Sequence, residues 1–111
     1  MKLSYEDHAT ITVIKVSGEL TADQIDAFRR SCQDRFEADI KHVVLDLEHM
    51  TFIDSAGLEA FLWIIDETSS RGGQLRVVNP DVTVSKILEI SRLDRRFNVH
   101  DTIESAAKSL R

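Results

Sequence analysis

One short run of the sequence places a carboxylate and a hydroxyl at the start of an expected helix. It reads Phe52-Ile53-Asp54-Ser55-Ala56-Gly57-Leu58. Aspartate is a favoured helix cap, because its side-chain oxygen accepts a hydrogen bond from a free amide of the first turn. With Asp54 as the cap, Ser55 occupies the first helical position, where capping does not need its hydroxyl. We expect that hydroxyl to be exposed at the positive end of the helix dipole, a setting that suits a phosphoryl acceptor.

Two neighbouring features fit this arrangement. Ile53 before the cap and Leu58 at the fourth helical position can pack together as a hydrophobic staple, and Gly57 keeps the first turn uncrowded. A phosphate on Ser55 would add a charge of about −1.5 to −2 and change the sign of the surface there, which would repel a partner bound over it. A simpler interpretation stays open, in which Asp54 and Ser55 only start a helix.

Other patterns that carry chemistry are missing from the sequence. It has no Gly-rich phosphate loop and no dinucleotide-binding glycine triplet. The four histidines are scattered without metal-ligand spacing, so we expect no metal site, no cofactor and no catalytic residue. A Ser-His-acid triad is spatial and stays open; it would need a histidine beside Ser55, with His49 nearest in sequence, although the GxSxG elbow is absent. A phosphorylated aspartate at Asp46 would need an acidic pair after an early strand, which the chain lacks.

Composition narrows the class of partner. The 111 residues fit one domain over 1–111, and a single cysteine, Cys32, allows no internal disulfide. The formal net charge of −5 disfavours nucleic acid and anionic membrane surfaces. No secretory signal is apparent at the N-terminus, and no apolar run approaches the length of a membrane span. We therefore expect a cytoplasmic protein without direct membrane insertion, which binds a protein or a small molecule.

The elements that would position Ser55 alternate between strands and helices. Strands are expected over 3–5, 9–16, 42–47, 74–78 and 97–100, with a turn at Asp7-His8, an end to the second strand over 17–20, and a loop over 48–53. Four helices follow from apolar residues spaced by three or four: Ile25, Phe28, Cys32 and Phe36; Leu58, Phe61, Leu62 and Ile65; Val84, Ile87 and Leu88; and Ile103, Ala106, Ala107 and Leu110. The cysteine lies within the first of these rows, which predicts core packing for it and not a reactive thiol.

The starts and ends of these helices have their own signals. The first helix has Thr21 or Asp23 as its cap, the third has Asn79 followed by Pro80, and the fourth has Asp101 paired with Glu104. The second helix runs through about residue 70 and is stopped by Arg71-Gly72-Gly73.

The order ββαβαβαβα implies parallel strands joined by right-handed crossovers. We expect an α/β fold with a mixed, mostly parallel sheet of four to five strands, an N-terminal antiparallel hairpin and about four helices.

The helix that follows Ser55 offers a second surface. Ala56, Ala60 and Trp63 lie on one side of it, away from the centre of its apolar face. Tryptophan is enriched in the residues that dominate binding energy at interfaces. We expect these residues to extend a partner surface from Ser55; the alternative is that Trp63 packs on a neighbouring helix.

The residues described so far resemble the STAS family, the anti-sigma-factor antagonists, over essentially the whole chain. The resemblance is carried by the run from Phe52 to Leu58 and by the upstream strand Val43-Val44-Leu45-Asp46-Leu47. Further matches are Gly18-Glu19-Leu20, Gly72-Gly73, Leu75-Arg76-Val77-Val78-Asn79-Pro80, Phe97 and Glu104-Ser105-Ala106.

The resemblance implies a bacterial signalling protein that is not an enzyme. Such a domain binds an anti-sigma factor, itself a serine kinase with a GHKL-type ATP-binding fold, and so frees a sigma factor. The kinase then phosphorylates the residue matching Ser55, which ends binding, and a PP2C-type phosphatase restores it. The expected partner-binding residues are Thr21, Asp54, Ser55, Ala56, Gly57, Leu58, Ala60 and Trp63. A second interpretation stays open, a STAS module of a sensory complex or of a lipid or anion transporter, as does dimerisation.

Three positions depart from the family pattern. Thr21 directly follows Gly-Glu-Leu where the family often has an acidic residue, which predicts a shorter loop beside Ser55. Arg92-Leu93 stands where a Gly-Leu pair usually ends the third helix; because arginine adopts the left-handed conformation less easily, we expect that end to differ. Ala56 replaces a serine or threonine, which leaves Ser55 as the one hydroxyl between Asp54 and Leu58.

Overall fold

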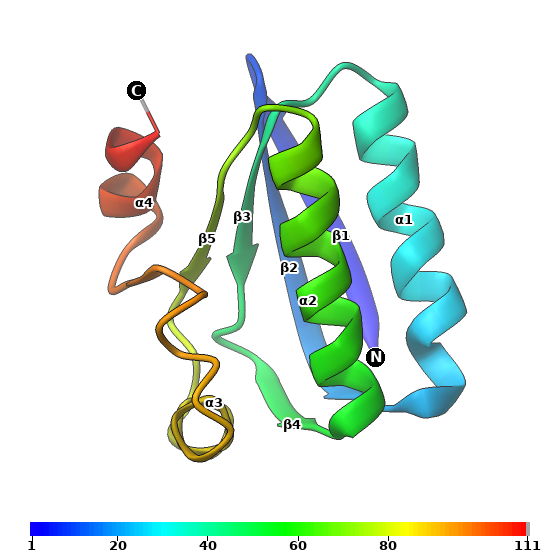
Figure 1. Ribbon diagram of the computed structural model, residues 1–111, viewed down its shortest axis with the longest axis vertical. Coiled ribbons are helices and arrows are strands. Elements are labelled where there is room, and N and C mark those ends of the chain that lie inside the picture. Colours follow the sequence, from blue (N-terminus) through cyan, green and yellow to red (C-terminus); the bar gives the residue numbers. More distant parts are fainter. Residues whose placement is uncertain (111) are drawn as a thin grey trace.

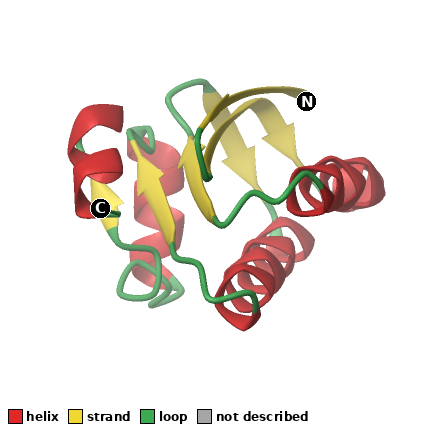
Figure 2. Ribbon diagram, turned by 90° about the horizontal axis from the view of Figure 1, so that it is seen from above, coloured by secondary structure: helices red, strands yellow, loops and turns green. Residues whose placement is uncertain are grey.

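A computed structural model describes residues 1–110 and contains a mixed six-stranded sheet with helices on both of its faces (Figures 1 and 2). The strands are β1 (Lys2–His8), β2 (Ile11–Leu20), β3 (His42–Asp46), β4 (Met50–Ile53), β5 (Leu75–Val78) and β6 (Val99–His100). The helices are the 3-10 turn η1 (Ala22–Gln24), α1 (Ile25–Glu37), α2 (Ser55–Ser70), α3 (Val82–Ile90) and α4 (Ile103–Ser109). None of the helices over this range is long and apolar enough to cross a membrane.

The sheet has the expected mixture of directions. Its order is β1-β2-β3-β5-β6, with an antiparallel β1–β2 hairpin and parallel pairings elsewhere. The α/β class and the N-terminal hairpin are therefore confirmed.

The second strand is longer than predicted and recruits an additional strand. β2 does not end over 17–20 but continues to Leu20, with a register shift between Gly18 and Glu19. Beyond that shift it pairs in parallel with β4, which occupies part of the predicted 48–53 loop. Gly18 adopts a φ of +82°, which a residue without Cβ tolerates easily, so the irregularity costs little at this position.

Helices form a layer on each side of the sheet. α1 and α2 lie side by side over one face (Figure 1), and the rings of Phe28, Phe61 and Phe97 meet there at centroid distances of 5.8 Å. α4 packs on the other face, where Ala106 belongs to a second apolar cluster together with Val13, Val44 and Val78. Cys32 is 1 % exposed and burial raises the pKa of its thiol to about 12, which confirms its role in the core.

The buried face of α2 is rotated from the predicted one. Leu58, Leu62 and Ile65 are only half-buried, whereas Ala60 and Ile64 are fully buried together with Gly57, Phe61 and Thr68. The reason is that α2 packs against the sheet and against α1 at once, so its covered face lies toward the corner between them.

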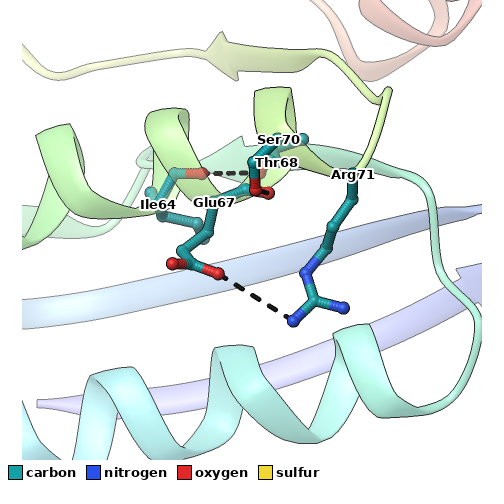
Figure 3. Close-up of polar contacts among 5 residues, drawn as sticks. All are labelled: Ile64, Glu67, Thr68, Ser70 and Arg71. Atoms are coloured by element: carbon teal, nitrogen blue, oxygen red, sulfur yellow. Dashed lines mark hydrogen bonds and ion pairs between the residues drawn. The ribbon is translucent and has the colours of Figure 1, made fainter.

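The C-terminal end of α2 is fixed by local polar contacts (Figure 3). The buried Thr68 hydroxyl donates to the Ile64 carbonyl at 2.6 Å, and Glu67 pairs with Arg71 at 3.9 Å. The Arg71 guanidinium also lies 4.7 Å from the ring centre of Phe36 on α1. Gly72 then adopts a φ of +78°, which confirms the predicted helix stop.

The β1–β2 turn and the start of α1 differ from prediction. The turn lies at Ala9 and Thr10, with Ala9 at a φ of 56°, and not at Asp7-His8. Thr21 makes no side-chain cap, and α1 begins after Gln24 without one.

The capping residues of α3 and α4 are also different. Asp81, and not Asn79, caps α3 by accepting from the Val84 amide at 2.8 Å. Thr102, and not Asp101, caps α4 by accepting from the Ser105 amide at 3.0 Å. Each observed cap lies one or two residues after the predicted one. In both places the sequence has two favourable cap residues close together, so residue type alone does not decide between them.

The C-terminal end of α3 has the left-handed conformation that a glycine usually adopts, although the residue there is Arg92. Arg92 adopts the left-handed conformation, with a φ of 61°. The Leu93 amide then donates to the Leu88 carbonyl at 2.9 Å, which closes the helix as a glycine would. The expectation of a different end is therefore wrong, and this end carries backbone strain.

Candidate functional site

The run from Phe52 to Leu58 lies where two parallel strands end and two helical segments begin. β2 and β4 finish together, because Leu20 pairs with Ile53. η1 follows β2 and α2 follows β4, so both segments start at the same end of the sheet (Figure 1). This topology brings the chain after Leu20 beside Asp54, a distant position in the sequence.

Asp54 binds both segments with its two carboxylate oxygens. Oδ1 accepts from the Gly57 amide at 2.9 Å, which confirms Asp54 as the cap of α2. Oδ2 accepts from the Ala22 amide at 3.1 Å, across 32 residues of sequence. The Asp54 amide also donates to the Leu20 carbonyl at 3.3 Å. Asp54 therefore fixes the η1 loop against the first turn of α2.

Gly57 allows this close approach. It is buried, and a Cβ added there would lie 2.5 Å from Cγ1 of Ile53 and 2.6 Å from the carbonyl oxygen of Leu20. The second of these atoms belongs to the backbone and has little freedom to move. The predicted uncrowded first turn is confirmed, and its position against β2 depends on glycine.

Ser55 is the first residue of α2 and is exposed. Its hydroxyl makes no hydrogen bond with any other part of residues 1–110, and the amides of Ser55 and Ala56 are likewise without an acceptor there. These amides lie in the first turn of the helix, where amides have no intrahelical partner and the helix dipole has its positive end. The site thus combines an accessible hydroxyl with amides that can donate to an anion placed on it.

The other expected partner-binding residues fall into two groups. Thr21, Ala56 and Leu58 are half-buried around the site. Ala60 is fully buried, so it cannot contribute to a surface, and the predicted face through Ala56, Ala60 and Trp63 is not continuous. Trp63 is half-buried against the core, with the Arg29 guanidinium 5.4 Å from its ring centre. It packs toward α1, as the alternative interpretation has it.

Exposed apolar side chains lie on β4 and on the helix that packs against it. Phe52 on β4 is 40 % exposed, and α3, which packs against β4, carries Val82 and Ile90 at 85 % and 75 % exposure. None of the three is an expected site residue. A helical wheel of α3 could have found two of them, because Val82 and Ile90 lie off the face marked by Val84 and Leu88.

The histidines and the Asp46 carboxylate are the groups on which the hydrolase, metal-site and phosphoaspartate interpretations depend. The His49 ring lies 3.9 Å from the Glu48 carboxylate, and no hydrogen bond joins a histidine to Ser55 within residues 1–110. Over the same range, no three His, Cys, Asp or Glu side chains form a group that could hold a metal ion. Asp46 is 5 % exposed and accepts from the Glu48 amide at 3.1 Å, so its carboxylate has a structural partner.

Comparisons with known proteins identify a family and a similar protein by sequence. The family model of the STAS domain matches residues 2–106. The anti-sigma F factor antagonist of Paenibacillus polymyxa is 25% identical over 111 residues, covering 99% of this chain and 95% of that protein.

Solved structures show the same fold. The crystal structure of TM1081 from Thermotoga maritima superposes with a TM-score of 0.90 at 25% identity, covering 97% of this chain and 93% of that one. The phosphorylated form of the Bacillus cell fate determinant SpoIIAA superposes with a TM-score of 0.77 at 24% identity, covering 99% of this chain and 100% of that one.

Proposed function

The chain belongs to the STAS domain family, and from this premise we propose that it is a cytoplasmic anti-sigma factor antagonist switched by phosphorylation of Ser55. It acts by binding and not by catalysis. In the unphosphorylated state it binds an anti-sigma factor and releases the sigma factor that this partner holds. The partner is also a serine kinase of the GHKL type, and a PP2C-type phosphatase resets the domain.

One observation carries the proposal. Asp54 uses both of its oxygens on the Gly57 and Ala22 amides, so the Ser55 hydroxyl has no structural task and is exposed at a helix start. The names of relatives support the choice of partner, because the Paenibacillus polymyxa protein is an anti-sigma F factor antagonist. The existence of a phosphorylated form of SpoIIAA supports the choice of modification.

The modification needs no rearrangement of the domain. Ser55 Oγ forms a bond to the γ-phosphorus of ATP, ADP leaves with the bridging oxygen, and a base of the kinase takes the hydroxyl proton. The product oxygens lie near the free amides of Ser55 and Ala56. A group with a charge of about −1.5 to −2 then stands three residues from the exposed Phe52, where the partner would bind, and repels the partner or occupies its space.

The test is phosphorylation by candidate anti-sigma kinases with ATP, with the modified residue mapped by mass spectrometry. Phosphate is expected on Ser55, and Ser55→Ala should abolish it and bind the partner constitutively. Ser55→Asp should weaken binding. Phosphate elsewhere, unaffected by Ser55→Ala, would remove the proposal.

A matched control is available on α3. Thr83 is an exposed hydroxyl in the first turn of a helix that Asp81 caps in the same way. Thr83→Ala should leave phosphorylation unchanged, because the kinase is expected to recognise the surroundings of Ser55 and not any capped helix start. Loss of phosphorylation in Thr83→Ala would contradict this assignment.

The alternative, a STAS module of a sensory complex or of a lipid or anion transporter, would use the same surface with another partner. Genes beside this one distinguish the two: a kinase-like ATPase gene supports the sigma-factor switch, and transporter genes support the alternative. No observation on Ser55 or its surroundings favours the alternative.

A further inference from the structure

The strand β1 forms an open edge of the sheet. Within residues 1–110 it pairs with β2 alone, so the backbone groups along its other side have no strand partner. β1 is seven residues long, from Lys2 to His8, and Tyr5 in its centre is 57 % exposed. An exposed strand of this length can pair with another strand through main-chain hydrogen bonds.

The two faces of β1 differ in chemistry. Tyr5 lies on the face toward α1, since the Arg35 guanidinium stacks 3.7 Å from its ring centre, and Leu3 shares that face by alternation. Lys2, Ser4 and Glu6 project from the opposite face. Lys2 has no acidic partner within residues 1–110, and the Glu6 carboxylate has one contact of this kind there, with the exposed ring of His8 on the same strand at 3.4 Å.

Self-pairing of this edge is restricted by symmetry. A two-fold axis perpendicular to the sheet extends the sheet and keeps each face on its own side. Directly opposed residues then share a face, so their numbers must have the same parity. The axis must therefore pass beside one residue of β1, which pairs with its own copy.

One register is complementary in both charge and apolar contact. With Ser4 on the axis, Lys2 opposes Glu6 of the second copy, twice by symmetry, and Leu3 opposes Tyr5. With Tyr5 on the axis, Lys2 would oppose His8, which is not an acidic partner. Leu3 would oppose Asp7, which places an apolar side chain against a charged one. Opposite-charge and aromatic–aliphatic cross-strand pairs stabilise a sheet, whereas like charges directly opposite destabilise it.

We infer that β1 is a self-association surface, through which two copies of this chain pair in antiparallel fashion with Ser4 on the two-fold axis. The sheet becomes continuous through both copies. The surface lies on the edge strand, whereas Ser55 lies at the carboxyl ends of β2 and β4, so self-association and the proposed partner binding use different elements.

Cysteine cross-linking tests the register directly. Opposed Cα atoms in an antiparallel pair are about 4.5 to 5.5 Å apart, within the range that a disulfide spans. Ser4→Cys should therefore form a covalent dimer under mild oxidation. Lys15→Cys is the matched control, because Lys15 is exposed opposite Ser4 on β2 and its two copies would lie three strand spacings apart, about 14 Å. The native Cys32 is buried and does not compete. A monomeric Ser4→Cys, or equal cross-linking of Lys15→Cys, would overturn the inference.

Charge exchange tests the pairing without a covalent bond. Sedimentation velocity over a range of concentrations should show a reversible dimer of the native chain. Lys2→Glu or Glu6→Lys alone makes both symmetric pairs repulsive and should weaken the dimer by about tenfold. The double variant restores both pairs and should restore the dimer. A native chain that stays monomeric, or a double variant no better than the single ones, would refute the pairing.

Discussion

The two-oxygen role of Asp54 leads to a prediction whose magnitude follows from the structure. Asparagine caps helices about as well as aspartate but offers one acceptor oxygen. Asp54→Asn can therefore keep the bond from the Gly57 amide, but its NH₂ group would then face the Ala22 amide. An unmet donor costs roughly 1 to 3 kcal/mol when buried. Ala22 is exposed and water can replace part of the loss, so we expect about 1 kcal/mol. Asp54→Ala loses both bonds and should cost about 2 kcal/mol.

The assay is urea unfolding combined with amide hydrogen exchange. In Asp54→Asn the Ala22 amide should lose protection while the Gly57 amide keeps it. Asp81→Asn is the matched control, because Asp81 caps α3 through one oxygen and one amide, that of Val84. It should cost less than about 0.5 kcal/mol. Equal costs for Asp54→Asn and Asp81→Asn, with Ala22 protection unchanged, would refute the bridging role.

Three further changes test the surroundings. Gly57→Ala should lower the free energy of unfolding in urea by about 1 to 3 kcal/mol, because the new Cβ would collide with the Leu20 carbonyl oxygen. An increase of about 1 kcal/mol, as expected at an uncrowded helical site, would contradict this. Arg92→Gly should stabilise by about 1 kcal/mol, read as a rise in melting temperature, because it relieves the left-handed strain; an unchanged or lower melting temperature would argue against that strain. Burial, with Lys41 and Arg76, lowers the pKa of His42, so the unfolded chain binds that proton more readily. The stability from His42 should be complete above about pH 6.5 and decline below it. In His42→Gln the urea concentration at the unfolding midpoint should therefore vary less between about pH 7 and pH 5. An unaltered pH dependence would show that His42 does not contribute.

The cap of α2 could be predicted from the sequence, but its second bond could not. Asp54 precedes an apolar helical pattern, and capping depends on residues only three positions apart. The bond to Ala22 involves a backbone amide, which no side-chain type marks, and it depends on β2 and β4 ending together. That juxtaposition is tertiary.

The strand β4 and the buried face of α2 were missed for related reasons. Met50 and Ile53 are buried while the two residues between them are exposed, so β4 lacks the alternation that identifies a strand. In α2, apolar residues occupy several faces, and a helical wheel does not show which of these faces packs against both the sheet and α1. The orientation is decided by fully buried Ala60 and Ile64, which only the packing reveals.

The expectation at Arg92 was wrong because local preference was outweighed by packing. Arginine avoids the left-handed conformation, yet Leu88 and Phe97 on either side of this turn are buried at 1 % and 0 % exposure. Burial of such side chains stabilises by about 1.5 to 3 kcal/mol each, more than the strain of one residue costs.

The central claim is tested most directly by the affinity of the domain for its anti-sigma kinase, before and after phosphorylation of Ser55. Both forms can be purified by ion exchange and titrated by calorimetry in the absence of ATP. We expect the phosphorylated form to bind on the order of a hundredfold more weakly, since like-charge or misplaced-charge contacts cost several kcal/mol. Equal affinity of the two forms would contradict a switch at Ser55.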